Sequence, residues 1–409
     1  MVGGGIFAVL GLAVQLSGGA TPFAFFLAGA VALITSYSYA KLSVKYPSQG
    51  GTVEFLNRAF GDGIFTGSLN VLLWISYIVM LSLYSYAFGS YAASFFPHQF
   101  HVFYRHIFTT LIIIVLTILN LMSAGVVGEV EEYIVAFKVA ILMFFVVAGL
   151  WSIKLNRFYQ HVPPAPELIA GGMVIFLAYE GFELIANTAM DIEDLNILPK
   201  AYYIAVGFVV FLYVAVAIVT VGNLPFQQII NARDYALAAA AKPFLGEAGF
   251  TLIAIAALLS TGSAINATLY GSARVSYIIA KYGELPKFLE RKVWSKPVEG
   301  LLLTSALTLV MANTLRLSNI STLGSAGFLI IFAMVNIANL KLRKTTGANP
   351  LISGAGSVMC FLALLILLAV TVRCLTDMIV FLVIVCSSFA FELIYRSVKK
   401  LGKKNNKNM

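Results

Sequence analysis

Long apolar runs alternate with short polar stretches along the whole chain. We identify about twelve such runs, and most of them approach or exceed the roughly 20 residues with which a helix crosses a bilayer. They cover residues 2–17, 22–42, 64–95, 106–122, 130–152, 167–188, 200–222, 247–281, 300–315, 319–340, 354–374 and 377–396. This pattern predicts an all-α integral membrane protein whose chain crosses the bilayer many times.

The first run is short and opens on an unusual sequence. It has about 16 residues, which make about 24 Å of helix against a hydrocarbon core of about 30 Å. Its three consecutive glycines, Gly3, Gly4 and Gly5, each cost about 1 kcal/mol of helix propensity relative to alanine. Unwound backbone is tolerated in a bilayer only where it lines a cavity, so the glycines favour a broken helix at a binding site. Close packing of helices through small residues explains the same glycines equally well.

Two polar loops suggest an internal repeat. Residues 41–63 and 223–246 each contain a short amphipathic stretch, and each follows the second run of a block of five. We therefore predict a first repeat over residues 1–152, with its first segment incomplete, and a second over residues 167–340. Two terminal helices at 354–396 and a basic tail at 397–409 complete the predicted organisation.

Composition and charge agree with a membrane location. Of the 409 residues, 60% are hydrophobic and 11% are charged, against roughly 25% charged in soluble domains. If the N-terminus lies in the cytoplasm, most lysines and arginines fall in cytoplasmic loops and the tail, which is the positive-inside pattern. The distribution of the basic residues, whose excess gives the net charge of +9, therefore predicts a cell-membrane protein with both termini in the cytoplasm. We expect anionic lipid on the cytoplasmic side of the membrane, and not nucleic acid, to be the partner of these basic residues.

The sequence offers no pattern typical of an enzyme, a cofactor or a metal site. The three cysteines lie in the last two apolar runs and form no disulfide framework: Cys360, Cys374 and Cys386. Three histidines form a loose cluster without the spacing of metal ligands: His98, His101 and His106. No nucleophile is accompanied by a base and an orienting group. We therefore expect neither catalysis nor a cofactor.

Two glutamates and a lysine lie within apolar runs, where ionisable side chains are costly and usually functional. Glu180 and Glu183 lie on either side of Gly181 in the sixth run. We expect at least one of them to support function; alternatively, both face the bundle interior, neutral or paired. Lys138 lies among apolar residues of the fifth run, where burial disfavours the charged form of a lysine and lets it exchange a proton. It could replace a coupling cation, carry the coupling proton, or pair with a carboxylate for structure alone.

The eighth run is rich in hydroxyl groups at Ser260, Thr261, Ser263 and Thr268. Such groups can donate or accept hydrogen bonds at a buried lysine, or ligate a small cation. In most helices, however, they bond back to carbonyls of their own helix. The sequence leaves both interpretations open.

Several short motifs together resemble the amino acid–polyamine–organocation (APC) superfamily. They are GGGIF at 3–7, YSYAKL at 37–42, YEGFE at 179–183, DIED at 191–194, NATLYG at 266–271 and AKYGELPKFLERKVW at 280–294. The lysine of IVAFKVAIL, Lys138, matches as well. Within the superfamily the chain looks most like the archaeal proton-coupled, broad-specificity amino acid transporters. The resemblance extends over nearly the whole chain.

This resemblance implies a leucine-transporter-like fold of two inverted five-helix repeats plus two terminal helices, with the first and sixth segments broken. It implies that a substrate carboxylate binds amides at the start of the first segment: Gly3, Gly4, Gly5 and Ile6. The substrate amino group would meet the sixth segment near Phe176, Ala178, Tyr179 and Gly181. Lys138 would lie where related carriers bind sodium, which implies coupling to protons without sodium. A monomer is expected.

Two departures from the family pattern affect these expectations. Family members carry half a helix before the glycine break, whereas Met1 stands almost at the break in this sequence. We therefore expect the chain to begin inside its first transmembrane helix, which puts its activity as given in question. The Asn-Pro pair that usually follows the sixth segment is replaced by Asp194-Leu195, although Pro199 remains.

The leading hypothesis from the sequence is a secondary transporter that takes up neutral amino acids with protons by alternating access. An amino acid exchanger without net proton coupling is the first alternative. A non-transporting amino acid sensor or an inactive, truncated relic is the second. Substrate choice stays open, because Glu180 could face the pocket and favour cationic substrates or face away from it.

Overall fold

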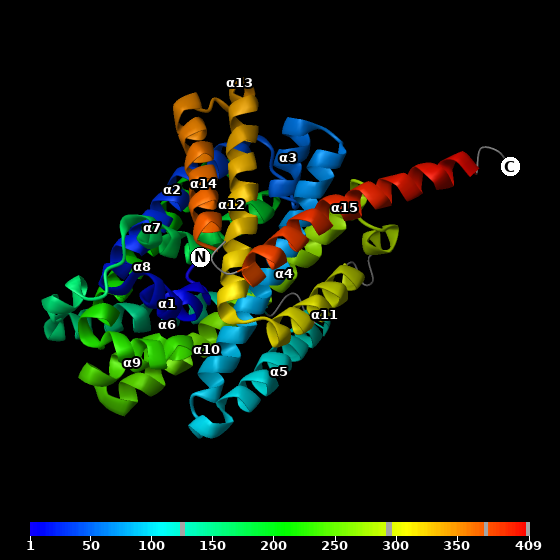
Figure 1. Cartoon of the computed structure of the whole chain (residues 1–409). Coiled ribbons are helices and arrows are strands. Elements are labelled where there is room, and N and C mark those ends of the chain that lie inside the picture. The colour runs from blue at the N-terminus through cyan, green and yellow to red at the C-terminus, as the bar shows by residue number, and fades with distance from the viewer. Residues whose placement is uncertain (123–126, 292–296, 372–374, 406–409) are drawn as a thin grey trace.

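The computed structural model describes residues 1–122, 127–291, 297–371 and 375–405, and every regular element in these ranges is a helix (Figure 1). In chain order the elements are α1 (Gly5–Ser17), η1 (Gly18–Ala20), α2 (Thr21–Lys45), α3 (Thr52–Phe60), α4 (Ile64–Ala93), η2 (His98–Phe100), α5 (His101–Met122), α6 (Val127–Gly149), η3 (Leu150–Ser152), η4 (Leu155–Tyr159), α7 (Ala165–Val174), η5 (Phe176–Asp191), η6 (Leu195–Ile197), α8 (Leu198–Asn223), α9 (Phe226–Asn231), η7 (Arg233–Tyr235), α10 (Ala236–Lys281), η8 (Lys287–Glu290), α11 (Val298–Thr314), α12 (Leu317–Lys341), α13 (Arg343–Thr346), α14 (Pro350–Thr371) and α15 (Leu375–Asn405). Cys374 and four of the basic residues lie outside the described residues: Lys292, Lys296, Arg373 and Lys407.

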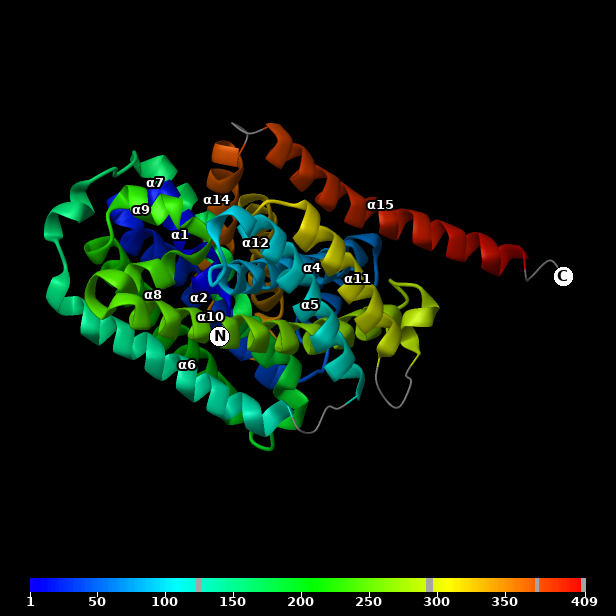
Figure 2. The same ribbon diagram turned by 90° about the horizontal axis from the view of Figure 1, so that it is seen from below.

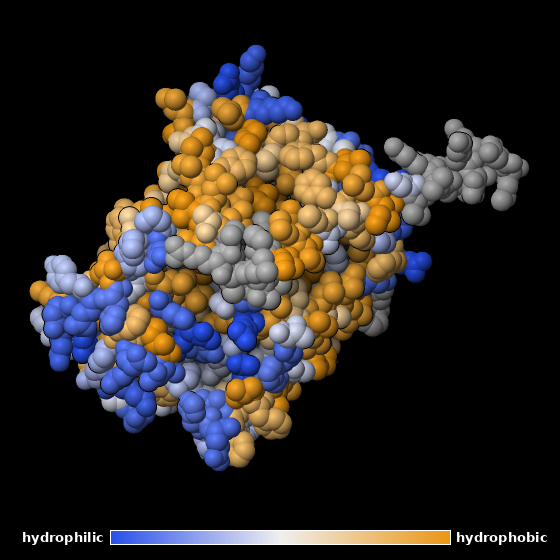
Figure 3. All heavy atoms as spheres, in the orientation of Figure 1, coloured by the Kyte–Doolittle hydropathy of each residue, from blue (hydrophilic) through white to orange (hydrophobic). Residues whose placement is uncertain are grey.

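The helices confirm an all-α membrane architecture. Among the described residues, eight helical stretches are long and apolar enough to cross a membrane, and the bent pair α7–η5 brings the number to nine. Hydrophobic side chains cover the middle of the face in Figure 3, while hydrophilic ones gather near its upper and lower left ends. The protein is therefore a multi-pass membrane protein, as its apolar runs predict. Twelve spans in two inverted repeats stay a prediction.

Two glycines explain where predicted runs end and begin. Gly18 follows α1 with φ 53°, and a Cβ at this position would lie 1.9 Å from the carbonyl oxygen of His161. Gly246, with φ 64°, divides α10 into two helices at the point where the eighth apolar run begins. Positive φ is accessible to glycine at little cost. The amphipathic stretches of the two polar loops contain the short helices α3 and α9.

Helices α4 and α12 form the buried centre of the bundle. Helix α4 packs against α10, α5 and α12, and α2 packs against α8. Figure 2 shows α6 along one edge of the bundle, whereas α15 extends away from the bundle toward the C-terminus. The first residues of the chain lie inside the bundle, where the start of α1 meets α4, η5 and α10.

Candidate functional site

The three glycines at the start of α1 lie against three other elements. A Cβ at Gly5 would come within 2.7 Å of Cα of Ala178, and one at Gly4 within 2.5 Å of the Tyr84 ring. Close helix packing therefore explains Gly4 and Gly5, as one of the two interpretations of the sequence expected. Gly3 is less crowded, with Ala264 at 3.4 Å from such a Cβ, and it lines a cavity.

Helix α1 presents the positive end of its dipole at this place. The helix begins at Gly5 after the N-cap residue Gly4. The first N–H groups of a helix have no carbonyl partner within the helix, and they favour negative charge. The predicted substrate-binding residue Ile6 is fully buried in this first turn. The start of α1 is thus chemically suited to a carboxylate.

The sixth apolar run is broken, as the resemblance implied. Helix α7 ends at Val174, and η5 continues from Phe176 at an angle of 41°. Element η5 is 16 residues of 3₁₀ helix, a conformation that often marks a functional hinge when it interrupts a helix. The predicted residues Phe176, Ala178 and Tyr179 lie directly after the break and are buried.

Two serines of α12 satisfy the backbone that the break frees. Ser321 Oγ and Ser325 Oγ donate hydrogen bonds to the carbonyl oxygen of Val174 at 2.7 and 2.8 Å. The N–H of Leu177 donates to Ser325 Oγ at 3.1 Å. Freed backbone groups in a membrane protein need such partners. Sequence reasoning missed both serines; their spacing of four residues, which places them on one helix face, was the available signal.

A cavity of about 270 Å³ opens between the start of α1 and five other elements. Its walls come from α4, α6, η5, α8 and α10. The lining residues are Met1, Val2, Gly3, Tyr84, Val135, Lys138, Val139, Gly181, Leu184, Ala205, Phe208, Val209, Ser263, Ala264, Ala267 and Thr268. Most of these side chains are apolar, so the cavity suits a small ligand with an uncharged side chain.

Lys138 is the one lysine or arginine among the residues that line this cavity. Its side chain is 2% exposed, and its Nζ donates a hydrogen bond to Ser263 Oγ at 3.1 Å. Ser260 Oγ donates to the carbonyl oxygen of Gly3 at 3.0 Å. Thr261 bonds instead to the carbonyl of Ala257 in its own helix. Two of the three predicted supporting hydroxyls therefore join α10 to α6 and to the start of α1.

The two intramembrane glutamates have different surroundings. Glu183 is fully buried and accepts hydrogen bonds from Thr52 Oγ1 at 2.8 Å and Tyr39 OH at 3.3 Å. Glu180 is 1% exposed, and its Oε2 has no hydrogen-bond partner among the described residues. Neither glutamate is among the residues that line the cavity. Tyr39 lies in the YSYAKL motif, but the sequence did not indicate that it meets Glu183.

Comparisons with known proteins show which family the chain is similar to. A family model described as amino acid permease matches residues 1–398. An uncharacterised protein of Methanocaldococcus jannaschii is 38% identical over 99% of this chain and 94% of its own length. The inner membrane transport protein YbaT of Escherichia coli is 33% identical over 89% of this chain and 85% of its own. The branched-chain amino acid permease BcaP of Lactococcus lactis is 26% identical over 83% and 77%. The family and the two relatives whose names state a role, YbaT and BcaP, are permeases and transporters, not enzymes.

Proposed function

The chain belongs to the amino acid permease family of the APC superfamily, and we propose that it is a secondary carrier that couples the uptake of neutral amino acids to the proton gradient. The observation that best supports proton coupling is the position of Lys138 in the cavity wall. Its ammonium lies next to Ser263 on α10, and α10 also holds Gly3 through Ser260. A change of charge at Lys138 therefore acts on the same helix that positions the substrate site.

The substrate in this proposal is a zwitterionic amino acid with an uncharged side chain. Its carboxylate binds at the first turn of α1, at Gly3, Gly4, Gly5 and Ile6, because the amides and the helix dipole favour an anion there. Its ammonium binds beside the break of the sixth segment, near Phe176, Ala178, Tyr179 and Gly181. The apolar cavity walls receive the side chain. The relative BcaP is named a branched-chain amino acid permease, which supports an apolar side chain on the substrate.

Alternating access requires parts that move against each other. In the proposed mechanism the two halves of the chain, residues 1–152 and 167–340, are inverted repeats, and their broken first segments, α1 and α7–η5, rock against the rest. The bend between α7 and η5 supports a hinge in the second repeat. The carrier lies in the plasma membrane with both termini in the cytoplasm, works as a monomer and needs no cofactor besides the proton.

Uptake into proteoliposomes tests this proposal. Labelled alanine or leucine is supplied to vesicles that contain the full chain, with and without an imposed inward proton gradient and with sodium replaced by potassium. Accumulation that needs the proton gradient and not sodium supports the proposal. Flux that appears only when the opposite side is loaded with amino acid would establish exchange instead. Binding of amino acid without flux would establish a sensor.

A further inference from the structure

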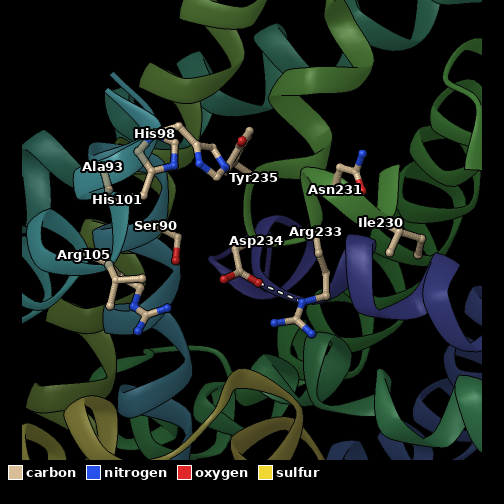
Figure 4. A pocket seen from close by; sticks show the side chains of 11 residues that line it. Ser90, Ala93, His98, His101, Arg105, Ile230, Asn231, Arg233, Asp234 and Tyr235 are labelled. Atoms are coloured by element: carbon tan, nitrogen blue, oxygen red, sulfur yellow. Dashed lines mark hydrogen bonds and ion pairs between the residues drawn. The ribbon is translucent and has the colours of Figure 1, made fainter. Parts of the chain in front are cut away.

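A second cavity, of about 260 Å³, lies apart from the one that contains Lys138. It is enclosed by the C-terminal part of α4, by η2 and the start of α5, and by the α9–η7 region (Figure 4). Its lining residues include Ser90, Arg105, Arg233 and Asp234. The proposed substrate site uses none of them.

The charges in this second cavity are unbalanced. Arg233 Nε donates a hydrogen bond to Asp234 Oδ1 at 3.0 Å. Arg105 Nη1 donates to Tyr86 OH at 2.6 Å, and Tyr86 OH in turn donates to Asp234 Oδ2 at 3.2 Å. Arg233 thus contacts Asp234 directly, whereas Arg105 reaches it only through Tyr86 OH. Two guanidinium groups are balanced by one carboxylate, so this cluster of three side chains keeps one positive charge. One additional carboxylate would neutralise it.

The geometry leaves room for that carboxylate. Asp234 accepts a hydrogen bond only from Nε of Arg233, so the two terminal amino groups of this guanidinium are available to a ligand. The Arg233 side chain is 34% exposed and the Asp234 side chain 22%, so both are partly shielded from water. A guanidinium binds a carboxylate through two parallel hydrogen bonds, one of the strongest polar contacts in proteins.

A polar side chain without a partner points to the same ligand. Ser90 lines this cavity and is 5% exposed, and its hydroxyl has no hydrogen-bond partner among the described residues. A buried hydroxyl without a partner is costly, so such groups usually meet a ligand or a water. Ser90 is a potential acceptor on the α4 wall, and Asp234 is an anion close to Tyr86 of the same helix. Together they can receive an ammonium group.

We infer that this second cavity is a separate binding site for a zwitterionic α-amino acid. Arg105 and Arg233 bind its carboxylate, and Asp234 and Ser90 bind its ammonium. The inference rests on the proposed function, because it takes the substrate to be an amino acid. It extends that function by adding an outer station at the end of the molecule that carries α9.

Helix α4 lines both the outer station and the cavity that contains Lys138, which we call the central cavity. Ser90 follows Tyr84, which lines the central cavity, by six residues or about 9 Å along α4. Helix α1 packs against the same part of α4: Tyr91 OH, next to Ser90, donates to the carbonyl oxygen of Phe7 at 3.2 Å. The carbonyl of Arg233 lies so close to α1 that a Cβ at Gly11 would be 2.1 Å from it. A ligand bound to Arg233 therefore acts on η7, whose backbone contacts α1 at Gly11.

Binding stoichiometry tests the outer station. Labelled alanine is titrated by equilibrium dialysis into the purified full chain in detergent, for the wild type, Arg105→Gln, Arg233→Gln and Ser90→Ala. We expect two classes of site in the wild type and one in the arginine variants, and for Ser90→Ala an outer-site affinity lower on the order of tenfold. Arg316→Gln, which removes an exposed arginine outside both cavities, is the control and keeps two classes. The Ser90 variant loses no charged pair, so it stays informative if the arginine variants do not fold.

Competition and flux separate the possible failures. We expect propionate to displace alanine from the outer class at high concentration and ethylamine to displace it more weakly, because the cluster carries net positive charge. A single class of sites in the wild type, with gradient-driven uptake intact, overturns the outer station and leaves the proposed function standing. Absence of both binding and uptake in the wild type overturns the proposed function, and the outer station with it.

Discussion

The ammonium nitrogen of Lys138 lies 3.1 Å from the hydroxyl oxygen of Ser263, and the contact joins α6 to α10 across 125 residues of sequence. Both residues line the central cavity. A charged group in apolar surroundings is strongly favoured to find such a polar partner. In the proposed mechanism, this pair is where a proton on Lys138 acts on α10, the helix that also contacts Gly3 through Ser260.

Replacing Lys138 should separate coupling from binding. In Lys138→Ala we expect gradient-driven accumulation of alanine to fall to the level of empty vesicles, while exchange of labelled for unlabelled alanine persists. Uptake and exchange are measured in the same proteoliposomes. Lys154→Ala, which removes an exposed lysine, is the control and keeps both activities. Undiminished accumulation by Lys138→Ala would show that another group carries the proton.

Gly5→Ala should destabilise the protein, because its Cβ would lie 2.7 Å from Cα of Ala178. Overpacking of this kind costs about 1–3 kcal/mol, and we expect a lower thermal midpoint in detergent together with loss of uptake. Gly354→Ala is the matched control in α14, where a Cβ meets no atom within 4 Å. It should leave stability unchanged or raise it by up to about 1 kcal/mol. Equal midpoints for both variants would refute the close contact of α1 with η5.

The double variant Ser321→Ala, Ser325→Ala should weaken the break of the sixth segment. It leaves the carbonyl of Val174 without its two hydroxyl donors, and an unsatisfied buried acceptor costs about 1–3 kcal/mol. Each single variant keeps one donor, so we expect the double effect to exceed the sum of the two single effects. Thermal unfolding measured on all four proteins checks this. Strict additivity would mean that the serines do not share the carbonyl.

Glu284 should make stability depend on pH near neutrality. Burial raises the pKa of this carboxyl, in the turn after α10, to about 7, although a hydrogen bond from Asn70 opposes the shift. A carboxyl with a raised pKa in the folded state favours folding fully below the unfolded value of 4.5, and this contribution is lost as pH rises through about 7. We expect it to amount to at most about 3 kcal/mol.

Thermal midpoints at pH 5 and pH 8 check the prediction for Glu284. Glu284→Gln, which mimics the protonated carboxyl, should lose part of the fall in midpoint between the two pH values and exceed the wild type at pH 8. Glu247→Gln, whose side chain is 80% exposed, is the control and should follow the wild type. A Glu284→Gln variant with the same pH profile as the wild type would show that this carboxyl does not titrate in the range.

The sequence singled out several residues of the candidate site one by one, but it did not indicate which of them meet. The motif GGGIF drew attention to Gly3, which the structure places in a cavity wall, and the apolar run around Lys138 indicated a buried lysine. The hydroxyl-rich eighth run left open whether its side chains bond to their own helix. The structure divides them: Ser263 meets Lys138, whereas Thr261 bonds to Ala257 four residues back. Periodicity alone does not distinguish these outcomes, since each hydroxyl has several partners within reach.

The resemblance to the APC superfamily implied the break in the sixth apolar run, whereas the sequence's own apolar pattern determined that the chain is helical and crosses a membrane repeatedly. These properties depend on local composition, because an apolar run of sufficient length must satisfy its own backbone in lipid. Only the tertiary structure decided which polar groups meet. Ser321 reaches Val174 and Thr52 reaches Glu183 across more than a hundred residues. The physical reason is that a buried polar group accepts any partner with suitable geometry, and the packing of distant helices alone selects which one is present.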